Sequence, residues 1–136
     1  MIISSDGARR PVSTKAWDIP FQRKDVTHIE EGTSDATRRA IFVEMKQQQA
    51  YGRAELVADG PIGYSGIGAT QKLENDRVTV WESVGPTKAT FHTHYYAAVA
   101  VTIGGPTPRA EWIPKGTVHT GEGAARGGRV YVFEIH

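Results

Sequence analysis

Short segments rich in β-branched and aromatic residues, separated by glycine and proline turns, dominate the second half of the sequence. RVTVWESV (77–84) follows an Asn-Asp turn signal, and RVYVFEIH (129–136) alternates as a half-buried strand does. Further strands are predicted over 87–103, which a Gly-Gly-Pro turn ends, and over 109–114. Short strands with dense turn signals are typical of a β-sandwich or barrel, so we expect an all-β fold.

An internal repeat guides the interpretation of the first half. Residues 38–49 fit an amphipathic helix, but their apolar run AIFV also fits a strand. Two segments match two later ones in the same order: 21–32 matches 112–123, and 38–45 matches 128–135. Because the last of these is predicted as a strand, we expect a strand over 39–45, and the helix stays as the alternative.

Composition narrows the function classes. The formal net charge is +1 and the basic residues are scattered, so we expect no nucleic-acid partner. Without cysteine, any metal must be held by His, Asp or Glu. The N-terminus lacks the pattern of a signal peptide, and the longest apolar stretch, Tyr95–Ile103, is too short to cross a bilayer. We therefore expect a cytoplasmic protein with no membrane partner.

Two histidines one residue apart, His92 and His94, point to a metal site. In a strand they project from the same face and Thr93 from the other, which makes half of a ligand set. PKGTVH (114–119) then places a tight Pro-Gly turn before a third histidine, His119. The alternative is an exposed or hydrogen-bonded histidine pair that binds no ligand.

These two motifs together resemble those of the cupin superfamily. Its first motif contains Gly, then H-x-H and a closing Gly, and its second is Pro-x-Gly-x-x-His. The matching positions are Gly85, His92, His94, Gly104, Pro114, Gly116 and His119. The resemblance covers residues 70–136 and implies a jelly-roll β-barrel. It also implies that His92, His94 and His119 hold a divalent metal ion such as iron, manganese, nickel or zinc.

The sequence departs from the cupin pattern at one ligand. Ala97, Ala98 and Val99 stand where the family places a carboxylate after H-x-H. Three neutral imidazoles can still bind a metal and leave positions open for substrate. Three residues are additional candidates for the site: Glu122 as a substitute carboxylate, Tyr96 as a phenol that orients substrate, and His28 beside or in place of His119.

The whole chain resembles a shortened two-cupin protein. Residues 1–45 resemble the strands of a cupin back half, 46–69 form a connection, and 70–136 carry both motifs. We expect one barrel over 1–136, with the N-terminal segment paired inside it or exchanged across a homodimer. The resemblance implies a metalloenzyme of the dioxygenase or isomerase/lyase type acting on a small polar molecule. A metal-free cupin that binds a small molecule or is purely structural is the alternative.

Overall fold

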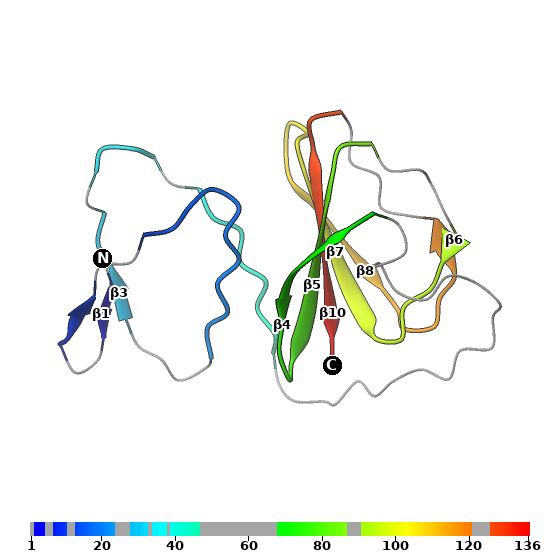
Figure 1. The fold of residues 1–136 in the computed structure, drawn as a ribbon, viewed down its shortest axis with the longest axis horizontal. Coiled ribbons are helices and arrows are strands. Elements are labelled where there is room, and N and C mark those ends of the chain that lie inside the picture. Colours follow the sequence, from blue (N-terminus) through cyan, green and yellow to red (C-terminus); the bar gives the residue numbers. More distant parts are fainter. Residues whose placement is uncertain are drawn as a thin grey trace. The chain divides into compact units, whose positions relative to one another are not determined.

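Antiparallel β-strands are the regular structure of the described part of this chain. The computed structural model describes residues 2–4, 7–10, 13–23, 28–32, 34–37, 39–46, 68–86, 91–120 and 126–136. Within these ranges there is no helix, so the expected all-β fold is confirmed (Figure 1). The same ranges accordingly contain no helix that could cross a membrane. The chain divides into two units, residues 1–47 and 48–136, and each is described by itself.

The first unit contains a small antiparallel sheet. Its strands are β1 (Ile2–Ser4), β2 (Arg9–Arg10) and β3 (His28–Glu30), in the order β2-β1-β3. The strand predicted over 39–45 is not formed, because residues 39–46 adopt neither strand nor helix. The Phe42 side chain is 85% exposed. An apolar run forms a strand only where partners cover it, and this one is left in contact with solvent.

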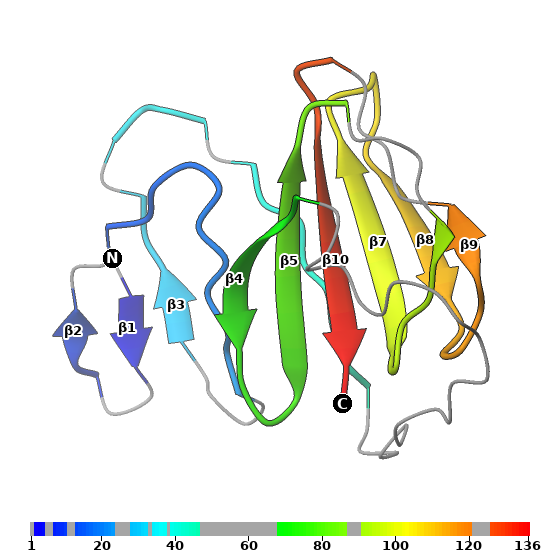
Figure 2. The same ribbon diagram turned by 45° about the vertical axis from the view of Figure 1, so that its right-hand side comes forward.

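The second unit is built on a five-stranded antiparallel sheet (Figure 2). Its order is β4 (Thr70–Glu74), β5 (Val78–Val84), β10 (Arg129–Ile135), β7 (Ala97–Ile103) and β8 (Arg109–Ile113). A separate pair consists of β6 (Phe91–His92) and β9 (His119–Thr120). Figure 1 shows this pair beside one face of the large sheet.

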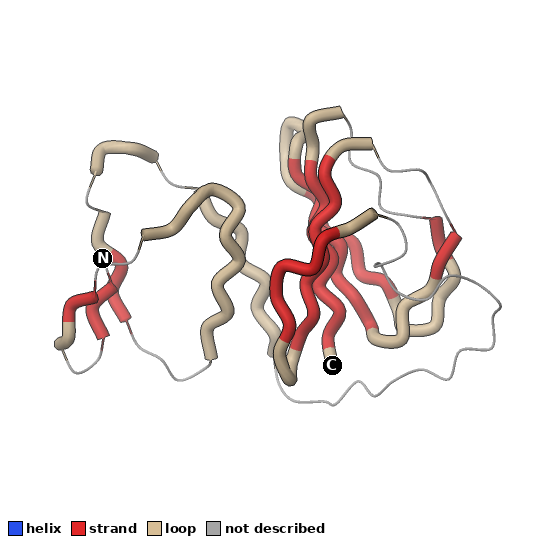
Figure 3. Tube along the Cα trace, in the orientation of Figure 1, coloured by secondary structure: helices blue, strands red, loops and turns tan. Residues whose placement is uncertain are grey.

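Most strand predictions in the second unit are confirmed, with one difference. The predicted strands over 77–84, 109–114 and 129–136 are present as β5, β8 and β10. Of the strand region predicted over 87–103, residues 87–90 lie outside the described part of the chain, and the rest forms two strands, β6 and β7, separated by residues 93–96 (Figure 3). Of the predicted connection over 46–69, residues 47–67 lie outside the described part of the chain.

The face of the sheet that looks toward β6 and β9 carries an apolar core. Alternate residues of a strand share a face, so Val130, Val132 and Glu134 of β10 project together. Val130 and Val132 are fully buried. They pack with Ala98, Ala100 and Ile113, and Trp81 covers the cluster. The carboxylate of Glu134 therefore lies on the same face of β10 as the core residues Val130 and Val132.

The opposite face holds a buried ionic cluster around Glu82. This carboxylate accepts hydrogen bonds from the Tyr131 hydroxyl (2.6 Å) and from Arg129, and Lys72 lies 3.4 Å away. Burial alone would raise the pKa of Glu82, but these three donors outweigh it, so the pKa is lowered. Burial and the hydrogen bond to Glu82 in turn raise the pKa of Tyr131.

Replacing Glu82 by glutamine should destabilise the fold in a pH-dependent way. Because the folded-state pKa lies below the ordinary glutamate value of 4.5, the ionised group stabilises the fold above that pH. The contribution is lost as the pH falls from 4.5 through the folded-state pKa. Hydrogen bonds to charged groups contribute about 1.5–3 kcal/mol, so we expect a loss of about 2 kcal/mol at pH 7. Urea unfolding of both proteins measures it, and a difference unchanged between pH 7 and pH 3 would contradict this account.

Two glycines meet where β7 ends and β10 begins. Gly104 has φ +122°, and a Cβ built on it would lie 2.5 Å from the Cα of Gly128. The carbonyl of Gly128 accepts a 2.9 Å hydrogen bond from the Gly85 amide. The backbone at Gly128 is therefore held from one side while Gly104 approaches it from another.

Candidate metal centre

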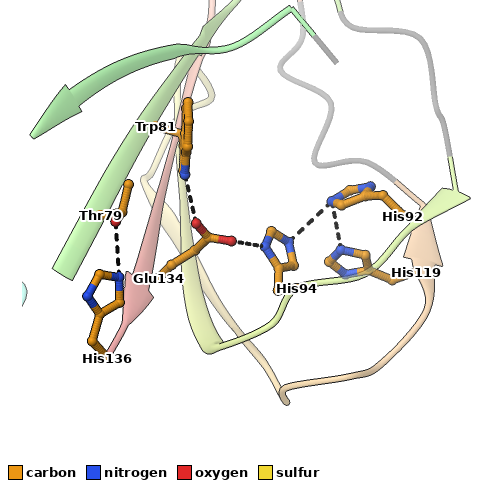
Figure 4. A network of polar contacts seen from close by, with 7 residues as sticks. All are labelled: Thr79, Trp81, His92, His94, His119, Glu134 and His136. Atoms are coloured by element: carbon orange, nitrogen blue, oxygen red, sulfur yellow. Dashed lines mark hydrogen bonds and ion pairs between the residues drawn. The ribbon is translucent and has the colours of Figure 1, made fainter. Parts of the chain in front are cut away.

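Three histidines, from the short strands β6 and β9 and from the segment that follows β6, converge beside the five-stranded sheet (Figure 4). His92 of β6 and His119 of β9 are directly opposite each other in the antiparallel pair. His94 follows two residues after His92. The Nε2 atom of His92 lies 3.2 Å from Nε2 of His94 and 2.9 Å from Nε2 of His119. His92 and His94 are fully buried and His119 is half-buried.

A tight turn brings the second motif to the first. The Thr117 amide donates to the carbonyl of Pro114 (3.3 Å), and Gly116 has φ 70°. A positive φ at the third position of such a turn is a property of the type II turn and favours glycine there. The amide of Gly116 then donates a 2.9 Å hydrogen bond to the carbonyl of His94. This backbone contact fixes the start of β9 relative to His94 and so helps to place His119.

A carboxylate from the central strand β10 stands behind His94. The Nδ1 atom of His94 lies 2.7 Å from Oε1 of Glu134, and the Trp81 indole N–H donates to Oε2 at 2.8 Å. Burial alone would raise the pKa of Glu134, but the hydrogen bonds from His94 and Trp81 outweigh it, so the pKa is lowered. An ionised carboxylate only accepts hydrogen bonds, so the proton of a neutral His94 resides on Nδ1. Its Nε2 therefore presents a lone pair to the other two histidines.

The convergent nitrogens suit a cation. One hydrogen on Nε2 of His92 can serve only one of its two neighbours fully, whereas a cation accepts a lone pair from each imidazole. Metal–nitrogen bonds of about 2.0–2.1 Å place two ligand nitrogens about 2.9 Å apart at right angles and about 3.3 Å apart at the tetrahedral angle. The contacts of 2.9 and 3.2 Å fall in this range, and all three donor atoms lie within 4.8 Å of one another. The spacing of His92 from each of its two neighbours therefore suits ligands of a divalent ion.

The additional candidates fall into two groups. His28 is in β3, but its side chain lies outside the described part of the structure, as does all of Glu122. Tyr96 is described and does not join the triad. Its ring packs against the ring of His136 with centroids 4.4 Å apart, and Nε2 of His136 lies 3.0 Å from Oγ1 of Thr79.

The sequence interpretation missed Glu134 and Trp81 as parts of the site. Glu134 occupies a position of the RVYVFEIH strand that shares a face with Val130 and Val132, which the period-2 pattern assigns to the core. A charged residue at a core position needs a polar partner, so the position of Glu134 in the strand pattern could have marked it as part of a polar site. The partner itself depends on how β10 lies between β5 and β7.

Comparison with known proteins gives no further information on the function of this chain. Comparison with models of protein families, with curated proteins and with solved structures finds no match. The assignment of function therefore rests on the antiparallel fold and on the geometry of the histidines.

Proposed function

We propose that this chain is a cupin-type protein that binds one divalent transition-metal ion through His92, His94 and His119. The observation that carries the proposal is the convergence of three Nε2 atoms at a buried position, with 2.9 and 3.2 Å between neighbours. Imidazole suits zinc, copper, iron and nickel, whereas magnesium and calcium favour oxygen ligands. The donor set therefore favours an ion of the first group.

Two further observations support the cupin class. The described strands of residues 48–136 form antiparallel sheets, and one histidine of each motif, His92 and His119, lies on a pair of strands beside the larger sheet. We propose that this arrangement is part of a jelly-roll barrel. Glu134 does not replace the carboxylate missing after H-x-H, because its Oε1 lies at Nδ1 of His94, whereas the ligand nitrogens cluster at the Nε2 atoms.

The proposed activity is that of a metalloenzyme acting on a small polar molecule. When bound, the ion would supply Lewis-acid polarisation of a carbonyl or enolate oxygen and, if it is iron, dioxygen chemistry. The imidazoles of the triad bring no charge of their own and leave coordination positions open. These positions are where the substrate would bind.

Adding Fe²⁺, Ni²⁺ or Zn²⁺ to chelator-treated protein should raise its melting temperature. A ligand that binds only the folded state stabilises it by about 2.7 kcal/mol when its free concentration is 100 times Kd. For a domain of this size that corresponds to a shift of several degrees. Differential scanning fluorimetry measures the shift, and elemental analysis after desalting should give one metal per chain.

Mg²⁺ is the matched control, because three imidazoles offer it no oxygen ligand. An equal shift with Mg²⁺ would indicate binding elsewhere on the surface. If no ion is retained and none changes the melting temperature, the metalloenzyme proposal is wrong. A metal-free cupin that binds a small molecule or is purely structural would then be the better description.

A further inference from the structure

Glu134 is placed to control the metal centre without touching the ion. Its two oxygens accept from two different donors, the His94 imidazole at 2.7 Å and the Trp81 indole at 2.8 Å. Trp81 is on β5 and Glu134 on β10, and both project from the face of the sheet that meets the histidines. The carboxylate is therefore clamped between a neighbouring strand and one member of the triad.

This clamp has a chemical consequence for His94. Neutral imidazole carries one hydrogen, and a carboxylate at Nδ1 draws that hydrogen to Nδ1. Nε2 then carries the lone pair, on the side of the ring that faces the other two histidines. A carboxylate behind a histidine ligand fixes the ring orientation and raises its basicity, and losing such a partner typically costs about 10–100-fold in metal affinity.

The carboxylate also sets the charge of the site. Three neutral histidines leave both charges of a divalent ion uncompensated, and Glu134 supplies one negative charge through His94. His92 and His94 are buried, so charges here act in a medium that screens them weakly. An anion at an open coordination position is attracted by the charge that remains.

Building on the proposed function, we infer that Glu134 is the positioning residue of the metal centre. Held by Trp81, it directs Nε2 of His94 at the ion and lowers the positive charge that the centre presents to an anionic ligand. Metal affinity and anion affinity must then respond in opposite directions when the carboxylate is removed.

Glu134→Gln tests this, because an amide offers one acceptor where the carboxylate offers two. The new NH₂ group must face either the Trp81 N–H or Nδ1 of His94, and in the latter case it favours the tautomer with the hydrogen on Nε2. Co²⁺ titration followed by visible absorption and calorimetry should show metal affinity reduced about 10–100-fold. At saturating Co²⁺, azide should bind the variant several-fold more tightly than it binds the wild type.

Two further variants complete the experiment. Trp81→Phe keeps the carboxylate and removes one donor, so its metal affinity should fall less than that of Glu134→Gln while its azide affinity stays near that of the wild type. Glu82→Gln is the matched control, since Glu82 is a buried carboxylate on the opposite face of the same sheet. Its Co²⁺ and azide affinities should equal those of the wild type.

The outcomes separate the two proposals. If the wild type binds no Co²⁺, the proposed function is wrong and this inference falls with it. If the wild type binds Co²⁺ but Glu134→Gln has unchanged affinity for the metal, only the positioning role is wrong. If metal affinity falls but azide binding is unchanged or weaker, Glu134 has only a structural role, and the inference that it lowers the positive charge of the centre is wrong. Equal changes in Glu82→Gln would overturn it as well.

Discussion

His92→Ala should abolish tight binding of a divalent cation while the protein remains folded. His92 is the middle member of the triad, because its Nε2 lies within 3.2 Å of the Nε2 atoms of both other histidines. Removing it leaves two donors that come from different segments of the chain. The loss in Zn²⁺ affinity should be greater than the loss of about 10–100-fold that is typical when the hydrogen-bond partner of a metal-binding histidine is removed. Calorimetry with Zn²⁺ measures this effect.

His136→Ala provides a matched control within the same unit. Its imidazole contacts Thr79 and the ring of Tyr96 and takes no part in the triad. Zn²⁺ affinity should therefore be that of the wild type. His119→Ala, which removes the half-buried member, should lose binding as His92→Ala does. Retained affinity in both triad variants, or an equal loss in His136→Ala, would locate the metal elsewhere.

Gly104→Ala should cause the largest loss of stability among the substitutions considered for this fold. A Cβ at this position would lie 2.5 Å from the Cα of Gly128, and φ of +122° is rarely adopted by residues with a side chain. Gly128 cannot move away without breaking its hydrogen bond to the Gly85 amide. Backbone strain and overpacking cost about 1–3 kcal/mol each, so we expect about 3 kcal/mol or more. Urea unfolding measures the difference.

The neighbouring glycine serves as the control for this effect. A Cβ on Gly105 would meet only the carbonyl oxygen of Thr107, at 3.7 Å, which is an ordinary contact. Gly105→Ala should therefore change stability by less than about 1 kcal/mol. Similar losses at both positions would show that the close approach of Gly104 to Gly128 is not what determines stability here.

The strands that could be predicted from the sequence are those whose pattern is local. β5 and β10 carry β-branched and aromatic residues at period 2, and turns bound them, so their positions follow from the chain itself. Residues 39–45 have a similar composition and form no strand, because a strand also needs a partner along its edges. The internal repeat compares residue types only, and it carries no information on whether a partner strand is present.

The residues of the candidate site also divide into those that a local sequence pattern predicts and those that it does not. The spacing of His92 and His94, and the turn before His119, pointed to the three histidines that the structure brings together. Their role as metal ligands stays a prediction. Glu134 was not anticipated, because its contact with His94 joins residues 40 positions apart in the sequence. Such a contact depends on strand order and register, which no local pattern encodes.

The central place of β10 has a consequence for how the centre is assembled during folding. β10 is the last strand in sequence order, yet it separates β5 from β7. Until it inserts, the ribbon β4–β5 and the ribbon β7–β8 share no ladder, and His94 lacks its carboxylate. Pairings between distant segments form late because loop closure must precede them. We therefore expect the contact of His94 with Glu134 to form in the same step that joins the two halves of the sheet, so that a chain stopped before that step has the three histidines but not their carboxylate partner.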